Sequence, residues 1–150
     1  MKILLKSFFS TLPLPTVYAH CDVPCGIYDP KSAQIAASGV AKMVEKIMNP
    51  PEFDPKNQNS VRNYHNSMTR YVLVKEEQAR KCKEELLILW TDYFKPEHLA
   101  MFPNLHDTFW KAAKLCSKNK QEVSIESAQA LVAAVDEIAD IFHKSKSASK

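Results

Sequence analysis

The chain has 150 residues, which is enough for one domain with a substantial hydrophobic core. Hydrophobic residues make up 45% of it and charged residues 25%, and only two glycines occur, which disfavours an all-β fold with glycine-dependent turns. The formal net charge is +3, and it falls to +1 without Lys2 and Lys6 of the leader described next, so we expect no nucleic-acid partner and no stable membrane insertion.

Residues 1–19 have the outline of a removable leader: a positive start, a short apolar stretch and a small final residue, Ala19. Polar residues and prolines interrupt the apolar stretch, which is too short to span a bilayer. A secretory signal would mean export, whereas a pro-segment removed by a dedicated peptidase would mean maturation in the cytoplasm. We favour the pro-segment and a cytoplasmic location, because cleavage after Ala19 would expose the motif that begins at His20.

A dense set of metal donors follows at once, in the sequence HCDVPCGIY of residues 20–28. Cleavage would add a free α-amine to the imidazole of His20, beside the thiols of Cys21 and Cys25. The amine, the Cys21 amide nitrogen and the two thiolates favour a planar arrangement, which suits nickel(II) or copper(II) better than tetrahedral zinc. Pro24 stiffens the loop between the cysteines.

Three kinds of chemistry compete for this motif. The first is a Cys21–Cys25 disulfide or dithiol switch, the second is a structural zinc site, and the third is a redox metal centre. Only the third explains a histidine placed between a leader and the first cysteine, so the pattern favours a redox metal.

The first expected helix begins at Asp29-Pro30, an N-cap followed by proline at the first helical position, and ends at Asn49-Pro50-Pro51. Residues 49–59 form a polar, proline-rich connector. The expected core side chains of this helix are Ile35, Val40, Met43, Val44 and Ile47.

A second, longer helix is expected from about Ser60 to Trp90, with apolar residues at alternating steps of three and four. His65 and Lys75 interrupt this seam, either as flanking side chains whose stems cover the core or as parts of an internal polar network, and we expect the former. The seam comprises Val61, His65, Met68, Val72, Lys75, Ala79, Cys82, Leu86 and Leu89.

An irregular aromatic segment, residues 91–103, separates this helix from a third over residues 104–118, and Ser124 caps a fourth. Together the four predict an all-α, up-down antiparallel four-helix bundle with an N-terminal metal-binding hook at residues 20–28. Cys82 and Cys116 are expected to be buried free thiols. The expected core residues of the last two helices are Leu105, Phe109, Ala112, Cys116, Ala128, Leu131, Val135, Ile138 and Phe142.

The stretch HCDVPCGIYDP resembles the nickel-binding hook of the nickel-containing superoxide dismutases, whose family pattern is HCxxPCxxY. The segment LWTDYFKP of residues 89–96 and the spacing of four helices over residues 20–150 also resemble that family. The resemblance implies an antioxidant oxidoreductase, a homohexamer of four-helix bundles with one nickel ion per subunit. It implies disproportionation of superoxide to dioxygen and hydrogen peroxide, with nickel cycling between +2 and +3.

The resemblance also implies the nickel ligands. These are the amine and axial imidazole of His20, the amide nitrogen and thiolate of Cys21, and the thiolate of Cys25. By the same resemblance Tyr28 gates small anions, and Asp22 fixes the hook against the bundle.

Further residues are carried over by the same resemblance. Tyr93 and Lys95 line the site, although Tyr93 alone would fit a half-buried core tyrosine equally well. At the two positions where the family carries a glutamate and an arginine that bond the axial histidine, this chain has Ala36 and Gln78. We expect Gln78 to supply one hydrogen bond and the metal potential to differ.

Two other functions remain open at this stage. A nickel or copper storage or delivery protein would use the hook without turnover. A redox switch would use Cys21 and Cys25 as a dithiol and would need neither metal nor leader removal.

Overall fold

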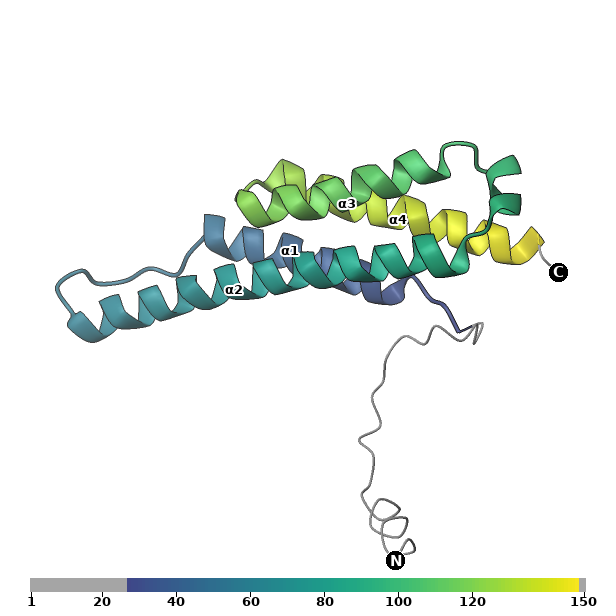
Figure 1. The fold of residues 1–150 in the computed structure, drawn as a ribbon. Coiled ribbons are helices and arrows are strands. Elements are labelled where there is room, and N and C mark those ends of the chain that lie inside the picture. The colour runs from purple at the N-terminus through teal and green to yellow at the C-terminus, as the bar shows by residue number, and fades with distance from the viewer. Residues whose placement is uncertain (1–26, 149–150) are drawn as a thin grey trace, which may run out of the picture.

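A computed structural model describes residues 27–148, which form an antiparallel bundle of four helices (Figure 1). The helices are α1 (Lys31–Met48), α2 (Gln58–Ile88), α3 (Leu105–Gln121) and α4 (Ile125–Ala148), and they run up and down in chain order. α1 and α3 each pack against both α2 and α4. The part of the chain that the structure describes contains no strand, so the predicted fold class is confirmed.

Side-chain caps fix where the helices begin. The Asp29 carboxylate accepts a hydrogen bond from the Lys31 amide (2.7 Å) just before α1, and the Ser124 hydroxyl accepts one from the Ser127 amide (3.1 Å) at the start of α4. α2 begins earlier than predicted, because Asn57 accepts hydrogen bonds from the amides of Asn59 and Ser60.

Alanines form much of the buried face of α1, and this corrects the predicted stripe. Ile35 was expected in the core, but its side chain is 60% exposed, whereas Val40 and Val44 are buried. A Cβ added at Gly39 would stand 3.0 Å from Gln78 Cγ, so the Gln78 side chain packs directly over this glycine. The other buried residues of α1 are Ala33, Ala36 and Ala37.

The predicted core positions of α3 and α4 are confirmed without exception. Their apolar residues recur at helical spacing and all face the centre of the bundle. Burial of each large apolar side chain stabilises the fold by roughly 2 kcal/mol. The buried side chains are Leu105, Phe109, Ala112, Cys116, Ala128, Leu131, Val135, Ile138 and Phe142.

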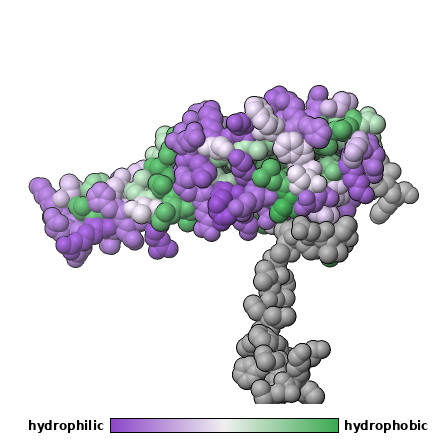
Figure 2. Space-filling model, viewed as in Figure 1, coloured by the Kyte–Doolittle hydropathy of each residue, from purple (hydrophilic) through white to green (hydrophobic). Residues whose placement is uncertain are grey.

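α2 is much longer than its neighbours, and its N-terminal half projects from the bundle (Figures 1 and 2). Its 31 residues span about 46 Å against about 27 Å for the 18 residues of α1. The projecting part, residues 58–74, has no buried residue and is called the arm below. The expected burial of Val72 is therefore wrong, and His65, expected as a flanking side chain whose stem covers the core, is exposed.

Lys75 is the first buried residue of α2, with only 2% of its surface exposed. Its ammonium donates hydrogen bonds to the backbone carbonyls of Asn119, of Lys120 (3.0 Å) and of Glu122 (3.2 Å). The predicted flanking role of Lys75 is wrong: the side chain caps the C-terminal end of α3, where the last carbonyls lack helical partners.

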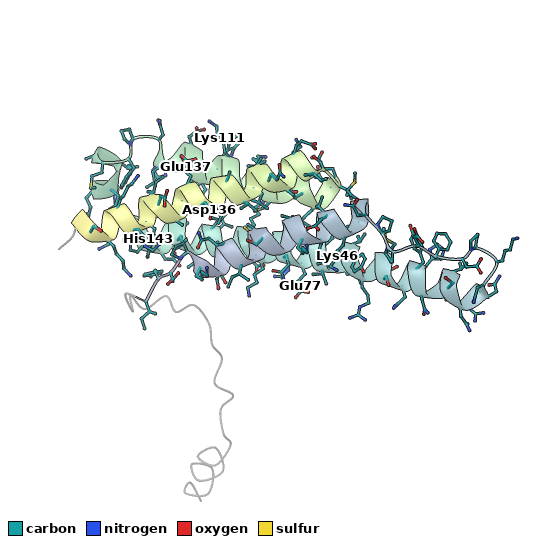
Figure 3. All side chains as sticks on the ribbon, turned by 180° about the vertical axis from the view of Figure 1, so that it is seen from behind. Lys46, Glu77, Lys111, Asp136, Glu137 and His143 are labelled. Atoms are coloured by element: carbon teal, nitrogen blue, oxygen red, sulfur yellow. The ribbon has the colours of Figure 1, made fainter. Side chains whose placement is uncertain are left out.

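Charged side chains cover the outer faces of all four helices, as Lys46, Glu77 and Lys111 illustrate (Figure 3). Exposed ion pairs occur within single helices, for example Lys111 with Asp107 at 2.6 Å, and such pairs stabilise little. Within residues 27–148, none of the helices combines the length and apolar character needed to cross a membrane.

Candidate metal centre

The described part of the chain begins next to the predicted donors. Ile27 and Tyr28 are its first residues, and they lead into α1 at the end of the bundle where α2 and α4 finish (Figure 1). The predicted cleavage site and hook residues lie outside the described residues; these are Ala19, His20, Cys21, Asp22, Pro24 and Cys25.

Tyr28 and Tyr93 meet at this end, although they are 65 positions apart in the sequence. Their ring centroids are 5.6 Å apart with the planes tilted by 58°, and both rings are half-buried against the core. Such tilted aromatic pairs are mutually attractive beyond the apolar area they bury. The last residue of the hook is thereby fixed against the segment that follows α2.

A π-helical turn places Tyr93 at this contact. α2 passes directly into the turn Leu89–Tyr93, which closes when the Phe94 amide donates to the Leu89 carbonyl (3.1 Å). Phe94 and Lys95 are extended, the latter because Pro96 follows it, and Pro96 begins a separate 3₁₀ turn. The wide turn therefore ends α2 with two adjacent aromatic side chains; single π turns occur often at functional sites.

Hydrogen bonds and ring contacts anchor Tyr93 on the far side. Its hydroxyl lies 2.8 Å from Ser145 Oγ, and Ser145 in turn donates to the Phe142 carbonyl (2.8 Å). Because the single Ser145 proton goes to that carbonyl, Tyr93 donates and Ser145 accepts. The Tyr93 ring also packs on Phe142, at 4.5 Å between centroids.

His98 completes the cluster from the 3₁₀ turn Pro96–Ala100. Its ring is buried and stacks on Tyr93 (5.8 Å, 15°), and its Nδ1 accepts a hydrogen bond from the Lys95 amide (2.9 Å). The Lys95 side chain itself points to solvent. We call Tyr28, Tyr93, Phe94, His98 and Phe142 the aromatic corner.

Sequence reasoning found Tyr28 and Tyr93 but missed the two polar residues that hold Tyr93, namely His98 and Ser145. A signal for Ser145 exists, since it follows Phe142 by three on the buried stripe of α4. His98 follows Lys95 by three after a proline, which is the spacing of a tight helical turn.

Ala36 and Gln78 lie at the packed interface of α1 and α2. Ala36 is fully buried and offers no polar group, and Gln78 is half-buried against Gly39. Of the two, only Gln78 has a side chain that can donate or accept a hydrogen bond.

Metal donors are concentrated in the hook. Among residues 27–148, histidine, cysteine, aspartate and glutamate nowhere gather in a group of three or more that could hold a metal ion. The hook supplies an imidazole and two thiols within six positions, and this nitrogen and sulfur set fits nickel or copper. The fold and this donor set together define the class of the protein as a helical-bundle metalloprotein.

Comparison with known proteins identifies the family. Residues 15–146 match the family model of the nickel-containing superoxide dismutases. The nickel superoxide dismutase of Streptomyces coelicolor is 35% identical over 136 residues, covering 91% of this chain and 95% of the relative, and that of Streptomyces seoulensis is 33% identical over the same shares.

Solved structures agree with this result. A native nickel superoxide dismutase superposes with a TM-score of 0.73 at 33% identity, covering 85% of this chain and 99% of the other. A nickel superoxide dismutase with the nickel ligation of the oxidised state gives 0.73 at 32% identity, with the same coverage. The chain belongs to the family of nickel-containing superoxide dismutases.

Proposed function

We propose that this chain disproportionates superoxide at a nickel ion held by His20, Cys21 and Cys25, after residues 1–19 have been removed. The observation that carries the proposal is the complete donor motif at residues 20–28, which lies inside the 15–146 match to the family. Two superoxide anions and two protons give dioxygen and hydrogen peroxide. Bound nickel supplies the one-electron couple, and the anionic thiolates of Cys21 and Cys25 bring its potential into the range of superoxide.

The aromatic corner has a positioning role in this proposal. Tyr28, three residues after Cys25, is held by the ring of Tyr93, so the C-terminal end of the hook rests on a wall that the bundle core supports. Tyr93 commits its proton to Ser145 and is fixed in orientation. Tyr28 then restricts access to the metal to small anions. Asp22 and Pro24 fix the conformation of the hook.

Lys95 adds the charge that this reaction needs. Its ammonium is exposed two residues after Tyr93, next to the aromatic corner. A positive charge near the entrance raises the local concentration of an anion such as superoxide and increases its rate of arrival.

Gln78 is proposed to bond the His20 imidazole in place of the residues that the family carries there. Support comes from its half-buried amide, whereas its counterpart Ala36 offers no polar group. A Gln78→Ala variant is expected to keep its nickel and to change both the turnover and the paramagnetic resonance spectrum. Unchanged turnover and spectrum would remove Gln78 from the site.

The decisive experiment compares protein cleaved after Ala19 with the uncleaved chain, both reconstituted with nickel. The cleaved protein is expected to consume superoxide and to give a rhombic nickel(III) signal in electron paramagnetic resonance. The uncleaved chain is expected to show neither, because the His20 nitrogen is then an amide. Bound metal without turnover would indicate a storage or delivery protein, and absence of stoichiometric metal would indicate a dithiol switch.

Processing and location belong to the same proposal. A peptidase cuts after Ala19, and the mature enzyme stays in the cytoplasm, since the donor motif begins immediately after the cut, as a dedicated pro-segment would require. Mass spectrometry of the mature N-terminus, together with cell fractionation, tests both points. A mature chain that starts elsewhere than His20, or that is found outside the cytoplasm, would contradict them.

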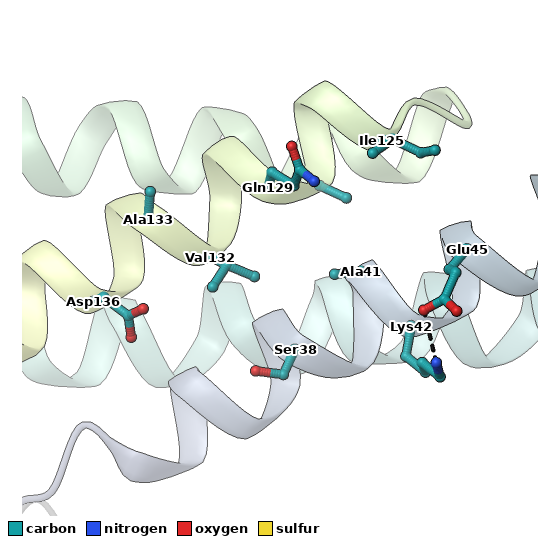
Figure 4. Close-up of a pocket in the computed structure, with 10 residues that line it drawn as sticks. Ser38, Ala41, Lys42, Glu45, Ile125, Gln129, Val132, Ala133 and Asp136 are labelled. Atoms are coloured by element: carbon teal, nitrogen blue, oxygen red, sulfur yellow. Dashed lines mark hydrogen bonds and ion pairs between the residues drawn. The ribbon is translucent and has the colours of Figure 1, made fainter.

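A homohexamer is the proposed assembly. A groove of about 710 Å³ runs between α1 and α4, with small side chains such as Ser38, Ala41 and Ala133 along it (Figure 4). Large apolar side chains are also exposed, including Ile35 at 60% and Trp110 at 54%. In the proposed hexamer, neighbouring subunits cover this groove and these side chains. Light scattering on the cleaved, nickel-loaded protein is expected to give six chains per particle, and a monomer would contradict this.

A further inference from the structure

Two thiols outside the hook meet in the core of the bundle. Cys82 of α2 and Cys116 of α3 are both fully buried and both free. Their thiols lie opposite each other across the interface between the two helices, close enough for each to shift the pKa of the other.

A neighbouring contact confirms the register of the two helices at this level. The Lys83 ammonium donates to Ser117 Oγ (3.1 Å), so the residues that follow the two cysteines also face each other. A disulfide forms only where two side chains face each other at short range, and these two positions of the packed helices meet that condition.

The surroundings make the two thiols unequal. The pKa of Cys82 is raised by its hydrogen bond to Cys116 and by burial. The pKa of Cys116 is lowered, first because Cys82 donates a hydrogen bond to its sulfur and also because Lys83 places a positive charge nearby. Since the thiolate is the reactive form, Cys116 is the sulfur that reacts first.

We propose that Cys82 and Cys116 form a peroxide-reactive dithiol that is oxidised to an intramolecular disulfide joining α2 to α3. Hydrogen peroxide is the product of the proposed activity, and only its source in the cell rests on that function. Peroxide is small and uncharged, and it reaches the core during local opening of the helices.

The reaction balances with peroxide alone. The Cys116 thiolate attacks one peroxide oxygen, the O–O bond breaks, and the departing hydroxide takes up the proton that Cys116 lost and leaves as water. The Cys82 sulfur then attacks the sulfenic sulfur of Cys116, the S–O bond breaks, and the hydroxyl leaves as a second water with the Cys82 proton. Two thiols lose two electrons and two protons, and peroxide gains both.

The test is to add hydrogen peroxide to the folded chain, alkylate the remaining thiols and cleave after glutamate. Cleavage places the hook cysteines in the fragment ending at Glu45, Cys82 in residues 78–84 and Cys116 in residues 98–122. The expected product is a cross-link between the last two fragments, with two hydrogens lost, which a thiol reductant reverses. Free Cys82 and Cys116 after the hook thiols have oxidised would overturn the proposal.

The unfolded chain is the control for proximity. In concentrated urea the same treatment is expected to give little cross-link between Cys82 and Cys116, because nothing then holds them together. An equal yield with and without urea would overturn the proposal that the fold creates the pair. Because peroxide is added directly, failure of this test is independent of any failure to consume superoxide.

A pair of lysine variants tests which sulfur attacks. Lys83→Gln removes the charge near Cys116 and is expected to slow cross-linking several-fold, whereas Lys81→Gln makes the same charge change at an exposed position of α2 and is expected to have no effect. Equal rates in the two variants would overturn the assignment of Cys116 as the attacking sulfur.

Discussion

Replacing Lys75 by methionine is expected to destabilise the bundle by about 3 kcal/mol. The methionine side chain is similar in length and volume to the aliphatic part of lysine. The change therefore removes the ammonium and leaves the packing nearly intact. Three carbonyls at the end of α3 lose their donor, and a buried carbonyl without a partner costs about 1–3 kcal/mol. The variant no longer has to bury a charged ammonium, and this gain offsets part of the cost of the unpaired carbonyls. The net loss of stability is therefore about 3 kcal/mol.

Urea denaturation followed by far-ultraviolet circular dichroism measures this effect. For a domain of this size the expected loss lowers the unfolding midpoint by about 2 M urea. Lys81→Met is the matched control, since Lys81 is exposed on the same helix and its loss should change stability by less than about 0.5 kcal/mol. If Lys75→Met were as stable as Lys81→Met, the capping role of Lys75 would be refuted.

Three further predictions concern the aromatic corner and the protein surface. Ser145→Ala removes the acceptor of the Tyr93 hydroxyl. We expect the free energy of unfolding to fall by about 1 kcal/mol and turnover to fall at unchanged nickel content. Full turnover would contradict the positioning role of Tyr93. Lys95→Gln is expected to slow superoxide consumption several-fold at low ionic strength, with the difference shrinking as salt is added; stopped-flow rates that show the same deficit at all salt concentrations would exclude steering. The pKa of Glu126 is lowered by backbone hydrogen bonding and by Ser124, so its carboxylate stabilises the fold at neutral pH, and this is lost as pH falls through the lowered pKa. Glu126→Gln should therefore melt lower than the parent at pH 7 but equally at about pH 2, and an equal deficit at both pH values would contradict this.

Periodicity predicted the fold well wherever large apolar residues face the core. All nine predicted core positions of α3 and α4 are buried, because Leu, Val, Ile and Phe at helical spacing leave one possible inward face. In α1 the same reasoning failed at Ile35, because the face that packs against the other helices consists largely of alanines, which the search for large apolar residues passes over. Close packing between helices depends on the partner helix, which a single sequence segment does not contain.

The same dependence on distant partners explains what was missed in α2. Lys75 was expected at the edge of the core, and its burial depends on carbonyls that follow it by more than 40 positions. The arm keeps the heptad spacing of its seam although none of its residues is buried, so periodicity overestimated its burial.

The functional motif was predictable because its members are consecutive. Six positions from His20 to Cys25 carry the whole donor set, and no folding is needed to bring them together. Tyr93 could be suggested only by resemblance, and its partner Ser145 lies 52 positions further along the chain. The assignment of the hook residues themselves remains a prediction.

The unequal lengths of the helices divide α2 into two thermodynamic regions. Residues after Lys75 are covered by α1 and α3, so their amide protons should exchange with solvent only when the whole bundle unfolds. The arm, by contrast, has no buried residue, and contacts such as the stack of Phe53 on Tyr64 at 4.3 Å lie at the surface. Its amides should therefore exchange by fraying at a far lower free energy. A continuous helix thus carries a gradient of protection along its length, and its outer turns can melt and reform while the end that supports Tyr93 stays ordered.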